Sequence, residues 1–129
     1  MPTFLNPPQT PKPSSNYAQG VLVPAGARRL IISGQVGMGA DGVLREGMEA
    51  QTEQVFDNIA AVLAAAGMEM PDLVKLVIYC TRPQETAIVR EVRTRKLGSH
   101  TPASTFLIVP ALANPGFLIE IEGEAVRED

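Results

Sequence analysis

The 129-residue sequence is poor in the side chains from which proteins build metal centres and acid–base triads. It contains one cysteine, Cys80, and one histidine, His100. A single cysteine cannot form an internal disulfide, and it suits a reducing compartment. The two residues also lack metal-ligand spacing. With no second histidine to act as base, the sequence argues against a Ser-His-Asp or Cys-His site, so we expect no metal and interpret His100 as a loop residue.

A strong excess of charge and a long apolar run are also missing. The chain has 11 Lys and Arg against 14 Asp and Glu, a net charge of −3, which provides no electrostatic footprint for nucleic acid or an anionic membrane. No apolar run reaches the roughly 18 residues of a membrane span, and no cationic start precedes an apolar stretch. We therefore expect a cytoplasmic protein that binds neither membrane nor, in the favoured interpretation, nucleic acid.

No phosphate-binding motif is present either. The glycines at 34, 37, 39 and 42 fit neither a P-loop nor a G-x-G-x-x-G sequence. They lie between a predicted strand and a predicted helix, where glycine is typical of turns. We therefore expect no nucleotide cofactor.

The length and the 45% hydrophobic composition indicate one domain, spanning residues 1–129. Residues 1–16 hold five of the eleven prolines and are predicted to form an extended arm. Residues 20–24 and 28–33 are predicted to pair as a hairpin around Pro24-Ala25-Gly26, which leaves Ser33 at a strand end and residues 34–47 as a loop.

Two helices and three further strands complete the predicted order. Apolar residues recur at spacings of three and four over residues 48–66, which predicts a helix that Gly67 terminates. Pro83 can begin a second helix that runs to about Lys96. The remaining apolar segments predict strands at 73–80, 103–109 and 117–126. The order β-β-α-β-α-β-β predicts an α+β fold, a sheet with two helices on one face.

Two of these strands are apolar on both faces. In residues 73–80, Val77 and Tyr79 alternate with Leu76 and Ile78, and Leu107 alternates with its neighbours in the same way. Two helices can cover only one face of the sheet, and an exposed apolar face marks an association surface. We therefore expect an oligomer that buries the second face against copies of itself.

This ordered set of segments resembles the RidA/YjgF family of reactive-intermediate deaminases. The resemblance runs from about residue 16 to residue 126. The matching motifs are Asn16-Tyr17-Ala18-Gln19-Gly20, Ile32-Ser33-Gly34-Gln35, Leu73-Val74-Lys75 and Ile119-Glu120-Ile121-Glu122, together with Gln51, Asn58-Ile59 and Ala65-Ala66-Gly67 in the first helix. It implies a chorismate-mutase-like fold, a mixed sheet and a homotrimer with sites between subunits.

In the chemistry that this resemblance implies, water adds to an iminium carbon and ammonia leaves, with no cofactor. Glu120 would be the catalytic residue that orients the water, although three alternating carboxylates can also be a solvated strand face. Tyr17 would line the cleft, or else simply pack its ring. The other implied substrate-binding positions are Ser33, Gly34, Arg90, Ser104, Thr105 and Phe106.

The departures from the family pattern concern carboxylate binding. Deaminating members carry P-A-R-S, and here the corresponding residues are Pro102-Ala103-Ser104-Thr105, so Ser104 replaces the arginine. A hydroxyl cannot imitate the charged, forked donors of a guanidinium. The sequence therefore predicts a poor deaminase of simple 2-imino acids, and predicts that Ser104→Arg would restore this activity.

A basic cluster lies on the second predicted helix, at Arg90, Arg93, Arg95 and Lys96. A solvated helix face is the simplest interpretation. Arg90, which replaces an asparagine of the family pattern, could also compensate for the missing arginine. A weak RNA contact is the least favoured alternative, considered because relatives have been labelled endoribonucleases or translation inhibitors.

We therefore expect a RidA-like homotrimer that binds a small imine, enamine or carbonyl-type metabolite. Whether it also hydrolyses this ligand is left open by the sequence. The competing interpretation is a non-catalytic ligand-binding or protein-interaction module that kept the trimer after losing the arginine.

Overall fold

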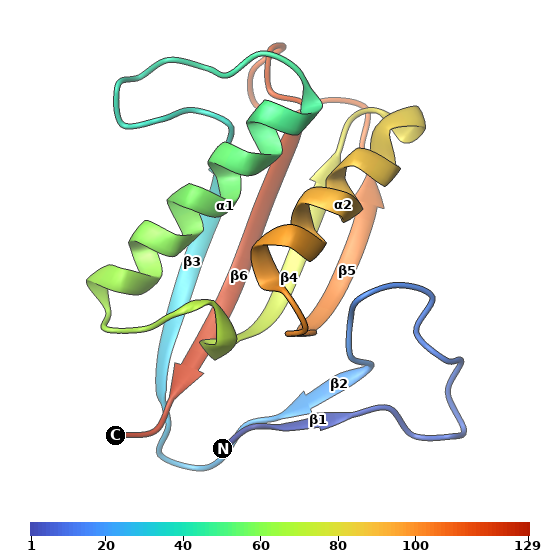
Figure 1. Cartoon of the computed structure of the whole chain (residues 1–129), viewed down its shortest axis with the longest axis vertical. Helices are drawn as coiled ribbons and strands as arrows, with labels where there is room; N and C mark the ends of the chain where they lie inside the picture. The colour runs from blue at the N-terminus through green and yellow to red at the C-terminus, as the bar shows by residue number, and fades with distance from the viewer.

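A four-stranded mixed sheet carries the structure, a computed structural model that describes all 129 residues. The strands lie in the order β3-β6-β4-β5, with β4 and β5 parallel and the other neighbours antiparallel. Both helices lie side by side over the same face of the sheet (Figure 1). This arrangement confirms the predicted α+β class. The bounds are β3 Arg28–Val36, α1 Met48–Ala65, β4 Leu73–Cys80, α2 Thr86–Leu97, β5 Ala103–Ile108 and β6 Ile119–Arg127, with 3-10 turns at Met70–Asp72 and Pro83–Glu85.

The core lies between the helices and the covered face of the sheet. Strand alternation places Leu76, Ile78 and Cys80 of β4 on this face, in register with Gly123, Ile121 and Ile119 of β6. The residues of α1 that face them follow the helical period and include Val55, Phe56, Ile59 and Leu63, all 0% exposed. Packing of these two apolar surfaces orients the sheet and the helices.

No helix covers the other face of the sheet, here called the open face. It carries the alternate residues of β4 and β5, among them Val77, Tyr79 and Leu107, and the carboxylates of β6. Leu107 is 43% exposed and Ile31, on β3, is 59% exposed. The predicted apolar second face is therefore present in the chain. Its burial against further copies stays a prediction.

The predicted hairpin between residues 20–24 and 28–33 is wrong. Residues Gly20–Leu22 form β2, which pairs with β1, Thr3–Leu5, of the N-terminal arm. The strand β3 pairs instead with β6, because β6 offers a partner as long as β3 itself, whereas β2 has only three residues. The arm is consequently part strand, and the two-stranded β1-β2 unit is separate from the main sheet.

Two other bounds also differ from prediction. Strand β3 continues through a bulge after Ile32 to Val36, so Ser33 lies inside the strand and the loop that follows is shorter. Helix α2 begins at Thr86, after a 3-10 turn that starts at Pro83. Neither helix combines the length and hydropathy that crossing a membrane would require.

Candidate functional site

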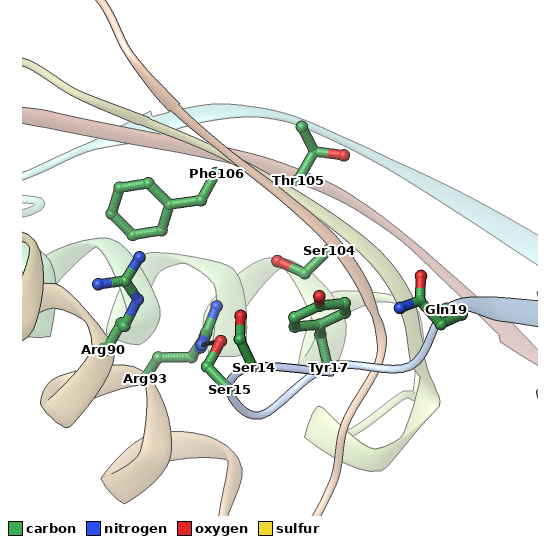
Figure 2. A pocket seen from close by; sticks show the side chains of 9 residues that line it. All are labelled: Ser14, Ser15, Tyr17, Gln19, Arg90, Arg93, Ser104, Thr105 and Phe106. Carbon is green, nitrogen blue, oxygen red and sulfur yellow. Dashed lines mark hydrogen bonds between the residues drawn. The ribbon is translucent and has the colours of Figure 1, made fainter. Parts of the chain in front are cut away.

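A pocket of about 360 Å³ opens at the outer edge of β5. Its walls come from three parts of the chain, namely β5, α2 and the segment 14–19 that precedes β2 (Figure 2). Five of the predicted site residues meet here. The lining consists of Ser14, Ser15, Tyr17, Gln19, Arg90, Arg93, Ser104, Thr105 and Phe106.

Backbone and side-chain hydrogen bonds hold segment 14–19 against the rest of the chain. The amide of Ala18 donates to the carbonyl of Pro102 at 3.1 Å, and Ala18 itself is 2% exposed. On the other side, Asn16 Nδ2 donates to Thr94 Oγ1 of α2 at 2.8 Å. Tyr17 lies between these two anchors, which places its ring in the pocket wall.

Helix α2 supplies two guanidinium groups to the pocket. Arg90 is exposed, and its guanidinium carbon lies 5.0 Å from the centroid of the Phe106 ring, within the range of a cation–π contact. Arg93 is only 2% exposed. It donates from Nη2 to Ser15 Oγ at 3.1 Å, and its Nε is buried without a partner.

Ser104 faces the helix side of the sheet, because it is in register with Leu76 of the covered face. Its Oγ is buried and has no hydrogen-bond partner. In Figure 2 the Ser104 hydroxyl and the Arg93 guanidinium both point into the pocket. Burial lowers the pKa of Arg93, and the nearby Arg90 lowers it further, yet an arginine stays protonated in a protein. The pocket therefore contains two cations, and no carboxylate lines it.

The remaining predicted residues, Ser33, Gly34 and Glu120, lie on the open face. The β3 bulge spans Ser33 and Gly34, opposite β6. A Cβ added at Gly34 would lie 2.7 Å from Glu120 Cδ, so the glycine leaves room for the carboxylate. Glu120 is half-buried and makes no hydrogen bond or ion pair in the chain. Its two successors on that face are paired, Glu122 with Tyr79 and Glu124 with Arg29.

Glu120 and the part of the pocket formed by Ser104 and Phe106 lie on opposite faces of the sheet, and Thr105, in register with Val77, is the pocket residue on the open face. Glu120 is in register with Tyr79, and Ser104 with Leu76, on the two strands that flank β4. From strand spacing and rise, their Cα atoms are roughly 14 Å apart. One chain therefore cannot bring Glu120 and Ser104 to a single small ligand.

Sequence reasoning grouped Arg93 with solvated basic residues and so missed it. The signal was present, since Arg93 follows the buried Val89 by four residues and thus shares its helix face. Arg95 and Lys96 do lie outward, paired with acidic residues of α1. His100 has a structural contact, with Nε2 2.7 Å from the carbonyl oxygen of Leu73.

Comparison with known proteins places these features in a family. A model of the endoribonuclease L-PSP family matches residues 7–127. A RutC family protein of Pyrococcus horikoshii is 32% identical over 120 residues, which cover 92% of each chain. The human 2-iminobutanoate/2-iminopropanoate deaminase is 31% identical over 86% of this chain and 80% of its own. A solved structure of the Rid protein YyfB from Yersinia pestis has a TM-score of 0.86 and 34% identity, covering 98% of both chains.

Proposed function

Because the chain belongs to the endoribonuclease L-PSP family, also called RidA/YjgF, we propose that it binds and hydrolyses a small imine or enamine metabolite between subunits of a homotrimer. One observation supports this most directly. Ser104 of the pocket and Glu120 lie on opposite faces of one chain, so neither site holds both residues. An assembly that places the open face of one copy beside the β5 edge of the next would unite them. A human relative named an iminobutanoate deaminase supports the reaction class.

In the proposed reaction the ligand occupies the pocket, with Tyr17 forming one wall and Ser33, Gly34 and Glu120 reaching it from the neighbouring copy. The Glu120 carboxylate accepts a proton from a water molecule while the oxygen of that water forms a bond to the imine carbon. The π electrons of the C=N bond move to nitrogen, which takes up the proton. A second proton then passes from the added hydroxyl group to this nitrogen, and the C–N bond breaks as the C=O bond forms, which gives a carbonyl compound and ammonia. General acid–base help of this kind contributes about 10²–10⁴-fold.

The alternative is a ligand-binding module without turnover, in which the pocket binds its ligand and Glu120 is only a solvated carboxylate. Ser104 favours this alternative because it removes the arginine expected in a deaminase. Cleavage of RNA is less favoured, since the overall charge is negative and the pocket has only two aromatic residues on which bases could stack.

The test is hydrolysis of imines generated in the assay, with semicarbazide as a competing trap. One imine comes from alanine through an amino-acid oxidase, and a second, carboxylate-free imine comes from a simple amine through an amine oxidase. We expect Glu120→Gln to lower hydrolysis at least about a hundredfold. Gly34→Ala should also lower it, because the added methyl displaces the Glu120 carboxylate.

Matched controls share the strand or the substitution. Glu124→Gln alters a carboxylate of the same strand that is paired with Arg29, and Gly20→Ala adds a methyl where nothing lies within 4 Å. Both should keep the activity. Turnover of neither imine by wild-type protein, or turnover that survives Glu120→Gln, would reject the proposal in favour of the binding module.

A further inference from the structure

We infer that Arg93, assisted by Arg90 and Ser104, forms a carboxylate-binding site, so that this chain holds the anionic end of its ligand from helix α2 rather than from strand β5. The inference rests on the proposed function in one respect, namely that the β5 pocket is the ligand site. It assigns the residues of this chain that hold the anionic end of the ligand.

The pocket without a ligand leaves buried polar groups unsatisfied. A guanidinium has five N–H donors, and in Arg93 only one bond, to Ser15, uses them within the chain. A buried cation without a counterion is costly, and so is a buried polar atom without a partner. Arg93 has both costs, a buried charge and an Nε without a hydrogen-bond partner. Ser104 Oγ is a second buried atom in the same pocket without a partner. A structural role does not explain Arg93, since a Met would fill its place without these costs.

The charged side chains that line the pocket are all cationic. The third arginine of α2, Arg95, meets its carboxylates outside the pocket, at Glu49 and Glu53. The pocket lining adds Arg90 to Arg93 and contains no acidic residue, so the two cations repel one another until an anion enters. An anionic ligand would remove that repulsion and satisfy the free N–H groups together.

The donors of the pocket are also positioned for a carboxylate. Arg93 is braced by Ser15, whose segment is fixed to α2 and to Pro102, so its guanidinium is held in place before a ligand binds. The Ser104 hydroxyl faces the same space (Figure 2) and can donate to a carboxylate oxygen. A carboxylate accepts two parallel N–H···O bonds from one guanidinium. A phosphate can accept the same pair of bonds, so inorganic phosphate is the competing anion in the test.

Calorimetry with pyruvate, pyruvamide and inorganic phosphate tests the site without relying on turnover. We expect pyruvate to bind wild-type protein at least tenfold more tightly than the neutral pyruvamide, and Arg93→Met to lose that preference. Arg95→Met, on the same helix but paired outside the pocket, should keep it. Equal binding of pyruvate and pyruvamide, tighter binding of phosphate, or no binding of any of them at millimolar concentration would each overturn the inference.

Stability without ligand provides a second readout. Arg93→Met should unfold at the same or a higher temperature than wild type, because a buried unpaired cation is replaced by an apolar side chain. A lower unfolding temperature would mean that Arg93 is structural and would overturn the inference. Ser104→Arg gives a further contrast. The sequence predicts a gain from this change because it assumes a site without a guanidinium; with Arg93 and Arg90 in the pocket, we expect no tighter pyruvate binding instead, and a gain would overturn the inference.

The two proposals can fail separately. Pyruvate binding that depends on Arg93, in a protein that hydrolyses neither imine, would leave the carboxylate site standing and reject the deaminase. Hydrolysis that depends on Glu120, in a protein whose ligand binding shows no Arg93-dependent preference for carboxylates, would support the deaminase and reject the carboxylate site.

Discussion

The three alternating glutamates of β6 have different surroundings although their spacing is regular. Glu122 accepts a hydrogen bond from the Tyr79 hydroxyl at 2.6 Å, and Glu124 pairs with Arg29 at 2.9 Å. Glu120 has no such partner and lies beside the space that Gly34 leaves. At this scale, the absence of a partner rather than the presence of a carboxylate separates the candidate catalytic residue from its neighbours.

The Tyr79–Glu122 hydrogen bond should make the free energy of unfolding depend on pH in the alkaline range. The hydrogen bond to Glu122 raises the pKa of Tyr79 above its ordinary value of 10.0. Below that value both the folded and the unfolded state keep the proton, so the bond contributes fully. Above it the unfolded state ionises first, and the contribution is lost as pH rises through the folded pKa.

Tyr79→Phe removes this hydrogen bond and its pH-dependent contribution to stability. We expect the difference in free energy of unfolding between wild type and variant, measured in urea, to be constant from neutral pH to about 9 and to shrink above pH 10. A difference that grows with alkaline pH, or one that does not change, would contradict the assigned hydrogen bond.

At the level of the strands, a glycine-to-alanine change has different consequences in β3 and in β6. A Cβ at Gly34 of β3 meets the far end of the Glu120 side chain, which can rotate away. A Cβ at Gly123 of β6 would lie 2.8 Å from the backbone carbonyl oxygen of Lys75 and 3.0 Å from Leu76 Cδ2. Because β6 pairs on both sides, with β3 and β4, it cannot shift away from this contact.

Gly123→Ala should therefore destabilise the protein by about 1–3 kcal/mol through overpacking, measured by urea denaturation. Gly34→Ala should cost less stability while losing more activity. Gly20→Ala serves as the control for both. If Gly34→Ala proved the more destabilising of the two, the assignment of space around Glu120 would be wrong.

At the scale of the whole molecule, the open face and the divided site lead to the same expectation. The protein should be a trimer in solution, with a mass by light scattering near three times 13.8 kDa. Leu107→Asp should dissociate it without unfolding the chain, because Leu107 is 43% exposed in one chain and becomes desolvated only when copies associate.

The control places the same charge elsewhere. Val43 is 54% exposed in the loop before α1, outside the sheet, and Val43→Asp should keep the trimer. A wild-type protein that stays a stable monomer at micromolar concentration would contradict both the trimer and the interfacial site. A Leu107→Asp variant that still forms trimers would move the interface away from the open face.

Much of the architecture followed from local patterns. The bounds of β4 agree with prediction, and α1 begins where it was predicted and ends one residue earlier, because apolar periodicity is read directly from side chains a few residues apart. The predicted pairing of β2 is wrong because a tight turn at Pro24-Ala25-Gly26 does not determine which strand pairs with β2. That choice depended on β1 and β6, which are distant in sequence.

The candidate site divides in the same way. Local sequence specifies which residue types are available, namely Tyr17 before β2, Gly34, Glu120, and Ser104 where the family pattern has arginine. The direction of Arg93 into the Ser104 pocket, and the position of Glu120 on the face opposite Ser104, follow from the folded arrangement alone. Burial and the facing of side chains depend on contacts between α2, β5 and the N-terminal arm, which segments far apart in the chain make only when it folds.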